Sequence, residues 1–226
     1  MGAEIKNFFF LTAKDGLSQA DFDHHWFRGH AALAMRVDPS IHRNIVQNMF
    51  LDPSEAGDLG SGLVETWHPD EEALRRLYGE PAFKELLADE PNFVRPGSTQ
   101  VVGTREEIVL DRAGKPAFGK LLLVFRAPRD GRDQALSAWR GPVRSAALGL
   151  PALTGYVESA RVESTRDLGS QVDSTVCDAV SELYFPDDAR RDQAMSSPEY
   201  ARLVEAARAA FGGEPVAIRV IEVRRR

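Results

Sequence analysis

One histidine in the first third of the chain is placed where it could transfer protons. Residues 18–37 are expected to form one amphipathic helix, in which Phe22, Trp26 and His30 recur at helical spacing and share a face. Ser18 suits the residue that caps the start of this helix. His30 is therefore expected to point towards the core, one turn after Trp26.

A buried histidine has two interpretations. In the first, His30 hydrogen-bonds a backbone carbonyl and only helps to close the core. In the second, its neutral imidazole, which titrates near physiological pH, takes a proton from a phenol or an acidic carbon and returns it elsewhere. The two are distinguished by whether the ring faces an open cavity or has both nitrogens bonded within the protein.

Other residues could form the walls of such a cavity. Asn7 is polar in an otherwise apolar strand and shares a face with Phe9 if the strand alternates, so it could bond a substrate oxygen or His30. Taken one at a time, each aromatic wall residue is more readily explained as part of the plain core. The expected substrate-binding residues are Asn7, Phe9, Trp26, Trp67 and Phe83.

The spacing of the histidines argues against a metal site. His24 and His30 lie roughly 240° apart around a helix at about 100° per residue, and His25 and His30 miss the i, i+4 spacing of helical metal ligands. Cys177 is the only cysteine, which excludes an internal disulfide and a cysteine-based metal cluster. The Gly60-Ser61-Gly62 segment precedes a strand, which is the wrong context for a dinucleotide-binding loop.

Two copies of one element pattern follow each other along the chain. The first has strands at 6–11, 41–50, 62–67 and 100–110, and helices at 18–37 and 69–88, the second helix being broken at Gly79. Pro69 and Pro186, Pro81 and Pro198, and Phe83 and Tyr200 share one separation, 117 residues (186 minus 69). We interpret this as an internal repeat.

The order βαββαβ predicts an α+β fold of two tandem ferredoxin-like units, residues 1–112 and 113–226. The first strand lacks polar alternation, so the sheet face away from the helices must also be buried. Packing the two sheets against each other would achieve this, as an intrachain dimeric α+β barrel.

Composition excludes several classes of protein. Lysine and arginine number 28 against 34 aspartate and glutamate, a net charge of −6, so no nucleic-acid partner is expected. No run approaches the ~20 apolar residues of a membrane span, and we expect a cytoplasmic protein. Residues 224–226, three arginines, are expected to be a solvated tail, and His42 and His68 to lie at the surface.

Several short segments resemble the EthD family of dimeric α+β barrel proteins, and together they cover nearly the whole chain as two copies. The segments are Lys6 with the aromatic strand after it, Gly16-Leu17-Ser18, Phe22, Trp26, Arg28-Gly29-His30-Ala31, Leu86-Leu87-Ala88-Asp89-Glu90 with Phe93, and Val180-Ser181-Glu182-Leu183-Tyr184-Phe185.

The resemblance implies an enzyme that needs no metal or organic cofactor and acts on a small hydrophobic, aromatic or polyketide-like molecule. It implies a cavity between sheet and helices, with His30 as general acid and base in a lyase-type reaction, as a dehydratase, decarboxylase or cyclase. The alternatives are a cofactor-free monooxygenase and a non-catalytic accessory protein that binds a small molecule. A homodimer of the fused chain is also compatible with the sequence.

The second copy departs from this pattern. Opposite His30 it has Pro142 or Val143, neither of which can carry a proton, and Pro142 is expected to interrupt the helix. The sequence therefore predicts one active site per chain, in the N-terminal unit.

Overall fold

The computed structural model describes residues 4–115, 117–163 and 176–225. By its backbone contacts the chain divides into two units. One comprises Met1–Arg105, Val162–Val176 and Glu222–Arg226, and the other comprises Glu106–Arg161 and Cys177–Ile221. The boundary expected at residue 112 follows the sequence repeat and stays a prediction.

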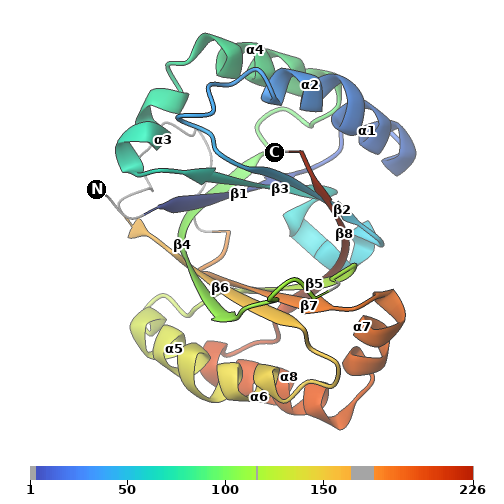
Figure 1. Cartoon of the computed structure of the whole chain (residues 1–226), viewed down its shortest axis with the longest axis vertical. Coiled ribbons are helices and arrows are strands. Elements are labelled where there is room, and N and C mark those ends of the chain that lie inside the picture. Colours follow the sequence, from blue (N-terminus) through green and yellow to red (C-terminus); the bar gives the residue numbers. More distant parts are fainter. Residues whose placement is uncertain (1–3, 116, 164–175, 226) are drawn as a thin grey trace. The chain divides into compact units, whose positions relative to one another are not determined.

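The first unit contains a four-stranded antiparallel sheet in the order β2-β3-β1-β4. Helices α1 to α4 lie on one face of β1 and β3 (Figure 1). The elements are β1 (Ile5–Leu11), α1 (Gln19–His25), η1 (Trp26–His30), α2 (Ala31–Ala34), β2 (Ile45–Phe50), η2 (Pro53–Leu59), β3 (Gly62–His68), α3 (Glu71–Leu77), α4 (Pro81–Asp89), η3 (Glu90–Asn92) and β4 (Gln100–Leu110).

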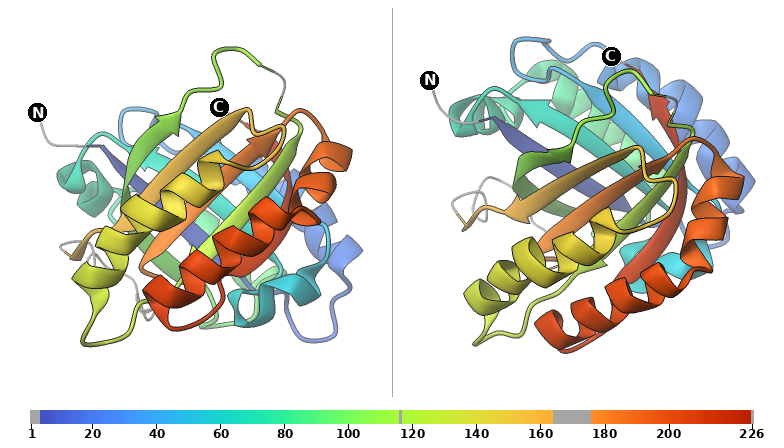
Figure 2. Two further views of the ribbon diagram at one scale, coloured as in Figure 1. Left: turned by 90° about the horizontal axis from the view of Figure 1, so that it is seen from below. Right: turned by 60° about the horizontal axis from the view of Figure 1, so that its bottom comes forward.

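The second unit repeats this order, with its sheet in the sequence β6-β7-β5-β8. In Figure 2 its yellow and orange-red helices run side by side across the strands of this sheet. The elements are β5 (Gly119–Phe125), α5 (Arg132–Ala138), η4 (Trp139–Val143), α6 (Arg144–Leu148), β6 (Gly155–Arg161), β7 (Ala179–Phe185), α7 (Asp188–Met195), α8 (Pro198–Phe211) and β8 (Val216–Arg224).

The strand registers of the two units coincide. In the first unit Phe9 lies opposite Val64, and at the matching place in the second unit Leu123 lies opposite Ser181. The mixed helix-and-strand fold expected from the sequence is confirmed. Because the registers match, each position of one unit has a defined counterpart in the other.

The helix expected over residues 18–37 differs from the observed one in its middle and its end. Ser18 caps its start, accepting a hydrogen bond from the Asp21 backbone N–H at 3.1 Å. The segment Trp26–His30 is a π-helical turn, and regular helix ends at Ala34. The second unit has the same π-helical turn at Trp139–Val143, and Pro142 lies inside it. The expectation that Pro142 interrupts the helix is therefore wrong.

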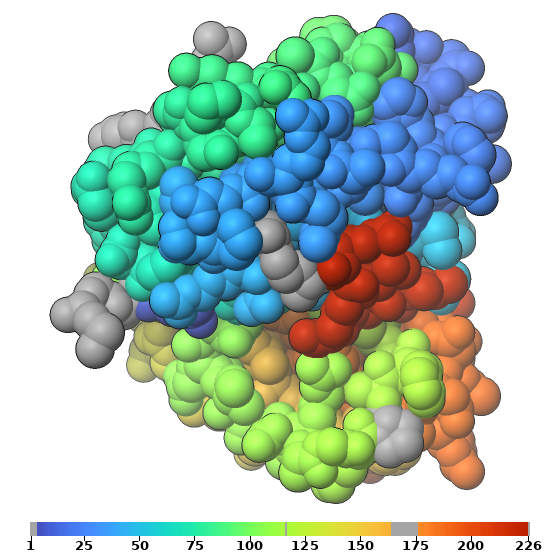
Figure 3. All heavy atoms as spheres, turned by 45° about the horizontal axis from the view of Figure 1, so that its top comes forward, coloured from blue at the N-terminus to red at the C-terminus, as the bar shows by residue number. Residues whose placement is uncertain are grey.

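Apolar side chains from helices and sheet form the core of the first unit. Ala34 from α2, Leu77 from α3 and Phe83 from α4 are buried against Ile5 of β1 and Ile45 of β2. In Figure 3 the atoms of α3 and α4 (teal to green) lie against those of the segment from α1 to β2 (blue). Within the described ranges, no helix combines the length and the apolar character needed to cross a lipid bilayer.

Candidate active site

A cavity in the first unit lies between the helices and one face of the sheet. It is small, about 40 Å³, which corresponds to a few water molecules. Its lining is mostly apolar, with few polar groups. The lining residues are Phe9, Leu11, Trp26, His30, Ala31, Ala34, His42, Ile45, Gln47, Val64, Thr66, Leu77, Phe83, Leu86 and Glu90.

His30 is a wall of this cavity, and one of its two ring nitrogens is held by the protein. Its Nδ1 lies 3.1 Å from Oδ2 of Asp89, at the end of α4. Its Nε2 makes no hydrogen bond within the described part of the chain. His30 thus lines the cavity with one ring nitrogen held by Asp89 and the other unbonded among the described residues.

Asp89 is a shared acceptor. Besides His30, its carboxylate contacts His25 Nε2 at 3.1 Å and accepts a hydrogen bond from the Asn92 amide at 2.8 Å. Burial alone would raise the pKa of Asp89, but these hydrogen bonds outweigh burial and its pKa is lowered. The ionised carboxylate therefore accepts the Nδ1–H of His30, and this fixes the tautomer in which Nε2 is the free base.

Burial sets the charge of His30. Desolvation lowers the pKa of this imidazole below its ordinary value, against the opposing effect of the Asp89 carboxylate. A neutral ring with Nδ1–H bonded to a carboxylate can accept a proton at Nε2 and then be stabilised as the cation.

The π-helical turn positions His30 relative to Trp26. Both residues are buried, whereas Arg28 and Gly29 between them are exposed. A π-helical turn carries one more residue than an α-helical turn. Single turns of this kind inside α-helices occur frequently at functional sites. Here the turn puts the indole and the imidazole into the wall of one cavity.

The start of this turn is held by hydrogen bonds from Gln47 and from Arg225. Gln47 donates to the Trp26 carbonyl at 3.3 Å and accepts from Arg225 Nε at 2.6 Å. Arg225 also donates to the Phe27 carbonyl at 3.0 Å. The expected solvated tail is therefore, at Arg225, part of the support of the site.

A second titratable group lines the same cavity. Glu90 follows Asp89 at the end of α4, and its Oε2 accepts a hydrogen bond from Thr99 at 3.2 Å. Burial raises its pKa to about 7, helped by the neighbouring negative charge of Asp89 and opposed by Thr99. Near neutral pH, Glu90 is thus a carboxyl group that can carry a proton, beside a histidine that can accept one.

Trp67 and Asn7 do not lie where the sequence analysis expected them. Successive strand residues face opposite sides, so Val64 and Thr66 line the cavity while Trp67 lies on the other face, its ring 4.6 Å from Lys6 Nζ. Asn7 shares the helix-covered face with Phe9 but does not line the cavity. Both of its amide atoms are buried without a partner among the described residues.

His42 and His68 are buried, which corrects the expectation that they lie at the surface. Their rings stack with centroids 5.4 Å apart. His68 donates from Nδ1 to the Ile41 carbonyl at 2.8 Å and accepts from the Thr66 hydroxyl at 2.9 Å, and burial lowers its pKa to about 4. His42 contributes to the cavity wall.

The second unit has no proton carrier at the position of His30. The two π-helical turns align Trp26 with Trp139 and His30 with Val143, which decides between the two counterparts that the sequence left open. Cys177 is buried, as expected, and burial raises its thiol pKa to about 12.

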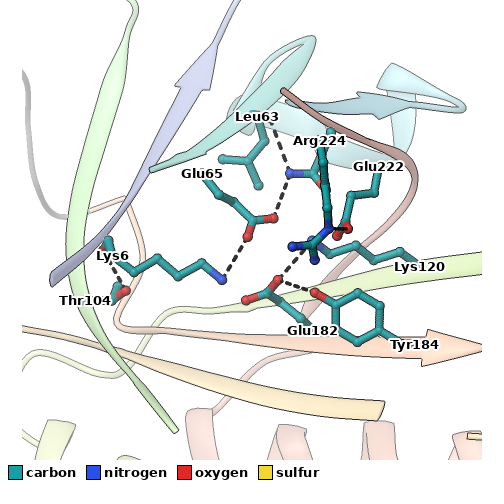
Figure 4. Close-up of polar contacts among 10 residues, drawn as sticks. Lys6, Leu63, Glu65, Thr104, Lys120, Glu182, Tyr184, Glu222 and Arg224 are labelled. Atoms are coloured by element: carbon teal, nitrogen blue, oxygen red, sulfur yellow. Dashed lines mark hydrogen bonds and ion pairs between the residues drawn. The ribbon is translucent and has the colours of Figure 1, made fainter. Parts of the chain in front are cut away.

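Each sheet also carries a buried lysine–glutamate pair on the face away from its helices (Figure 4). Nζ of Lys6 lies 2.8 Å from Oε2 of Glu65, and Nζ of Lys120 lies 2.9 Å from Oε2 of Glu182. The pairs occupy matching positions of the two units. Breaking such a pair strongly destabilises a protein, because one buried charge is left behind.

Asp89 and Glu90 were missed as site residues by reasoning from sequence. Their segment carried the family resemblance, but nothing local shows that an acidic pair at the end of one helix meets a histidine 59 residues away on another. Within the described ranges, no three His, Cys, Asp or Glu side chains gather closely enough to hold a metal ion.

Comparison with known protein families confirms the resemblance for the first copy of the repeat. A family model described as the EthD domain matches residues 14–97. This part of the chain is therefore similar to the EthD domain. The match contains the π-helical turn, His30, Asp89 and Glu90, and it lies in the first copy of the repeat. A search of curated proteins found no significant match.

Several solved structures share the fold over almost the full chain. An anthrone oxidase-like protein is 14% identical, with a TM-score of 0.67 over 98% of this chain and 92% of its own. A proposed monooxygenase from Fusobacterium nucleatum is 9% identical, with a TM-score of 0.62 over 98% and 93%. A proposed chlorite dismutase is 12% identical, with a TM-score of 0.56 over 99% and 96%. At these identities the likeness concerns the fold alone.

Proposed function

We propose that the EthD domain is an enzyme that uses His30 as a general base on a small hydrophobic, aromatic or polyketide-like molecule. The observation that carries the proposal is the state of His30. Asp89 holds its Nδ1, and its Nε2 has no partner in the described chain at the wall of an apolar cavity. A histidine that only closes the core would have both nitrogens satisfied.

Glu90 supports a lyase-type reaction. In the proposed elimination, Nε2 of His30 takes a proton from an acidic carbon, and the protonated Glu90 gives a proton to the leaving hydroxyl, which departs as water. The pKa of His30 is lowered and that of Glu90 raised to about 7, so the required base and acid forms coexist slightly below neutral pH.

The size of the cavity bears on the substrate. A space for a few waters does not admit a ring unless the surrounding side chains move. The helix α4 carries both Phe83 and Leu86 of the wall. We propose that this helix moves to enlarge the cavity when substrate enters.

The arrangement of the two sheets is also part of the proposal. We propose that they pack face to face, as an intrachain version of the dimeric α+β barrel. Support comes from the buried residues on the helix-free face of β1, and from the fold of the similar solved structures.

A panel of aromatic β-hydroxy ketones and β-keto acids tests the proposed reaction, with loss of water or carbon dioxide followed by mass spectrometry. A correctly placed general base contributes roughly 10²- to 10⁴-fold to the rate. We therefore expect His30→Gln to slow turnover by about that factor while the far-ultraviolet circular dichroism stays unchanged. His24→Gln, on the exposed side of the same helix, is the matched control and should keep full turnover.

Two outcomes would contradict the proposal. Full turnover in a folded His30→Gln protein would assign the base to another residue. Saturable binding of the panel with no turnover by the unaltered protein would favour the accessory binding protein.

A cofactor-free monooxygenase is the second candidate, favoured by the names of the similar anthrone oxidase-like protein and the proposed monooxygenase. There His30 would remove a phenolic proton before dioxygen reacts with the ring. Turnover that consumes dioxygen, and that stops when dioxygen is removed, would favour this candidate over the lyase.

A further inference from the structure

The indole N–H of Trp26 lacks a hydrogen-bond partner in the part of the chain that the structure describes. Trp26 is fully buried and is a wall residue of the cavity that contains His30. A buried donor without an acceptor lowers the stability of a fold. Because the unpartnered N–H of Trp26 does not stabilise the fold, we consider a role for it in binding a ligand.

The second unit contains the same tryptophan with its donor satisfied. The indole N–H of Trp139 donates to the Ser181 hydroxyl at 3.0 Å. Ser181 pairs with Leu123 across the sheet, and in the same register Val64 pairs with Phe9 in the first unit. Val64 therefore stands where the second unit has the acceptor, and valine offers none.

The neighbouring positions differ in the same sense. The Tyr156 hydroxyl bonds Glu158 at 2.7 Å and lies 3.2 Å from the Ser181 hydroxyl, and Arg144 bonds Glu158 through two nitrogens. At the matching positions of the first unit, Ile45 replaces Tyr156 and Ala31 replaces Arg144. Both Ile45 and Ala31 line the cavity. In the second unit, polar side chains bonded to one another occupy the positions that line the cavity in the first unit.

We propose that the Trp26 indole N–H donates a hydrogen bond to a neutral carbonyl oxygen of the ligand, so that the cavity takes an aromatic or alkyl ketone. An indole N–H can only donate, and the apolar surroundings disfavour a charged acceptor. Val64 is the specificity-determining residue, because it leaves the donor available. The inference rests on the proposed function in taking this cavity as the substrate site, and it names the substrate class.

Two probes of nearly the same shape test the inference, acetophenone with a carbonyl oxygen and ethylbenzene without one. Each is titrated into the whole protein, with the indole N–H resonances followed by ¹H–¹⁵N NMR. The chain has three tryptophans, so three resonances are assigned from Trp→Phe variants. We expect acetophenone, and not ethylbenzene, to shift the Trp26 resonance downfield, with the Trp139 resonance unmoved.

The affinity ratio of the two probes measures the hydrogen bond. One neutral hydrogen bond should favour acetophenone by about 2- to 10-fold beyond the difference in apolar area. Trp26→Phe, which keeps a ring but loses the donor, should remove this preference. Val64→Ser should remove it too, because the serine hydroxyl would accept the indole N–H as Ser181 does in the second unit. Trp139→Phe is the matched control and should leave the ratio unchanged.

Equal ratios in the unaltered protein and in Trp26→Phe would overturn the inference, and so would saturation by neither probe. The failure of the proposed function has a different signature. In that case His30→Gln would leave turnover intact, whereas the response of Trp26 to acetophenone does not depend on His30 acting as a base.

Discussion

At the scale of single residues, the site combines groups whose charges are set by burial. His30 is kept neutral, Asp89 is kept ionised by three hydrogen bonds, and Glu90 is kept protonated to an unusually high pH. A base and an acid in one apolar cavity is the combination that elimination of water requires. Asp89 and Glu90 are adjacent in sequence, yet their surroundings shift their pKa values in opposite directions.

The pH dependence of turnover should report this pair. Activity should rise as pH passes the pKa of His30, which lies below the ordinary 6.5, and fall above about 7 as Glu90 loses its proton. Glu90→Gln should lower the rate by roughly 10²- to 10⁴-fold and remove the alkaline fall, since an amide cannot donate the proton. The measurement is turnover against pH, with Glu85→Gln, exposed on the same helix, as control. A fall above pH 7 that persists in Glu90→Gln would exclude Glu90 as the acid.

His68 should make the fold sensitive to acid. Its pKa is about 4 in the fold and ordinarily 6.5, so the unfolded chain binds a proton that the fold does not bind between those values. Stability from this residue is therefore present above about pH 6.5 and is lost as pH falls to 4, by about 3 kcal/mol. Urea unfolding at both pH values should show a smaller loss for His68→Gln than for the unaltered protein. An equal loss in both would mean that His68 titrates normally in the fold.

At the scale of elements, the same π-helical turn serves two purposes. In the first unit it presents Trp26 and His30 to a cavity, and in the second it buries Trp139 and Val143 in the core. Gly62, at the start of β3, allows the first of these, because a Cβ there would lie 2.6 Å from the Trp26 ring. Gly62 thus has a structural reason unrelated to phosphate binding.

Val143 should matter for stability and not for chemistry. It is fully buried, so Val143→Ala should lower the free energy of unfolding by about 2 kcal/mol through lost apolar contact and a small cavity. Turnover at a temperature where the variant stays folded should be unchanged. Loss of turnover in a folded Val143→Ala protein would show that the second unit takes part in the reaction.

Local patterns predicted much of this fold, and contacts distant in sequence account for most of what they missed. The helix carrying His30, the strands and the repeat follow from periodicity and from prolines at constant separation. The π-helical turn changes which residues share a face by one position, which a 3.6-residue period does not reveal. Trp67 was assigned to the cavity although strand alternation with Val64 and Thr66 would have placed it on the opposite face.

At the scale of the whole molecule, the two units share one order of elements and differ in the side chains at matching positions around the π-helical turn. The first copy has small or apolar residues at Ala31, Ile45 and Val64, and the second has Arg144, Tyr156 and Ser181 joined to Glu158 in a hydrogen-bonded network. The two units thus share their sheet registers and the buried lysine–glutamate pairs, and where the first has a cavity beside His30 the second has, among the described residues, this hydrogen-bonded network.

Ligand should bind once per chain. Calorimetric titration with acetophenone should saturate at one molecule per chain, since the polar network fills the matching space of the second unit. Ile45→Tyr, which copies Tyr156 into the first unit, should abolish this binding. Tyr156→Phe, its counterpart in the second unit, should leave the affinity unchanged. Saturation at two molecules per chain would refute the assignment of a single site.

The contacts of Arg225 have a consequence for synthesis of the protein in the cell. Gln47, which holds the Trp26 carbonyl, is itself held by a residue 178 positions further along the chain. The residues of the turn are synthesised before Arg225, so they precede this support in the order of synthesis. The turn that presents Trp26 and His30 therefore gains this support only once residue 225 has been translated, and a chain truncated before Arg225 would lack it.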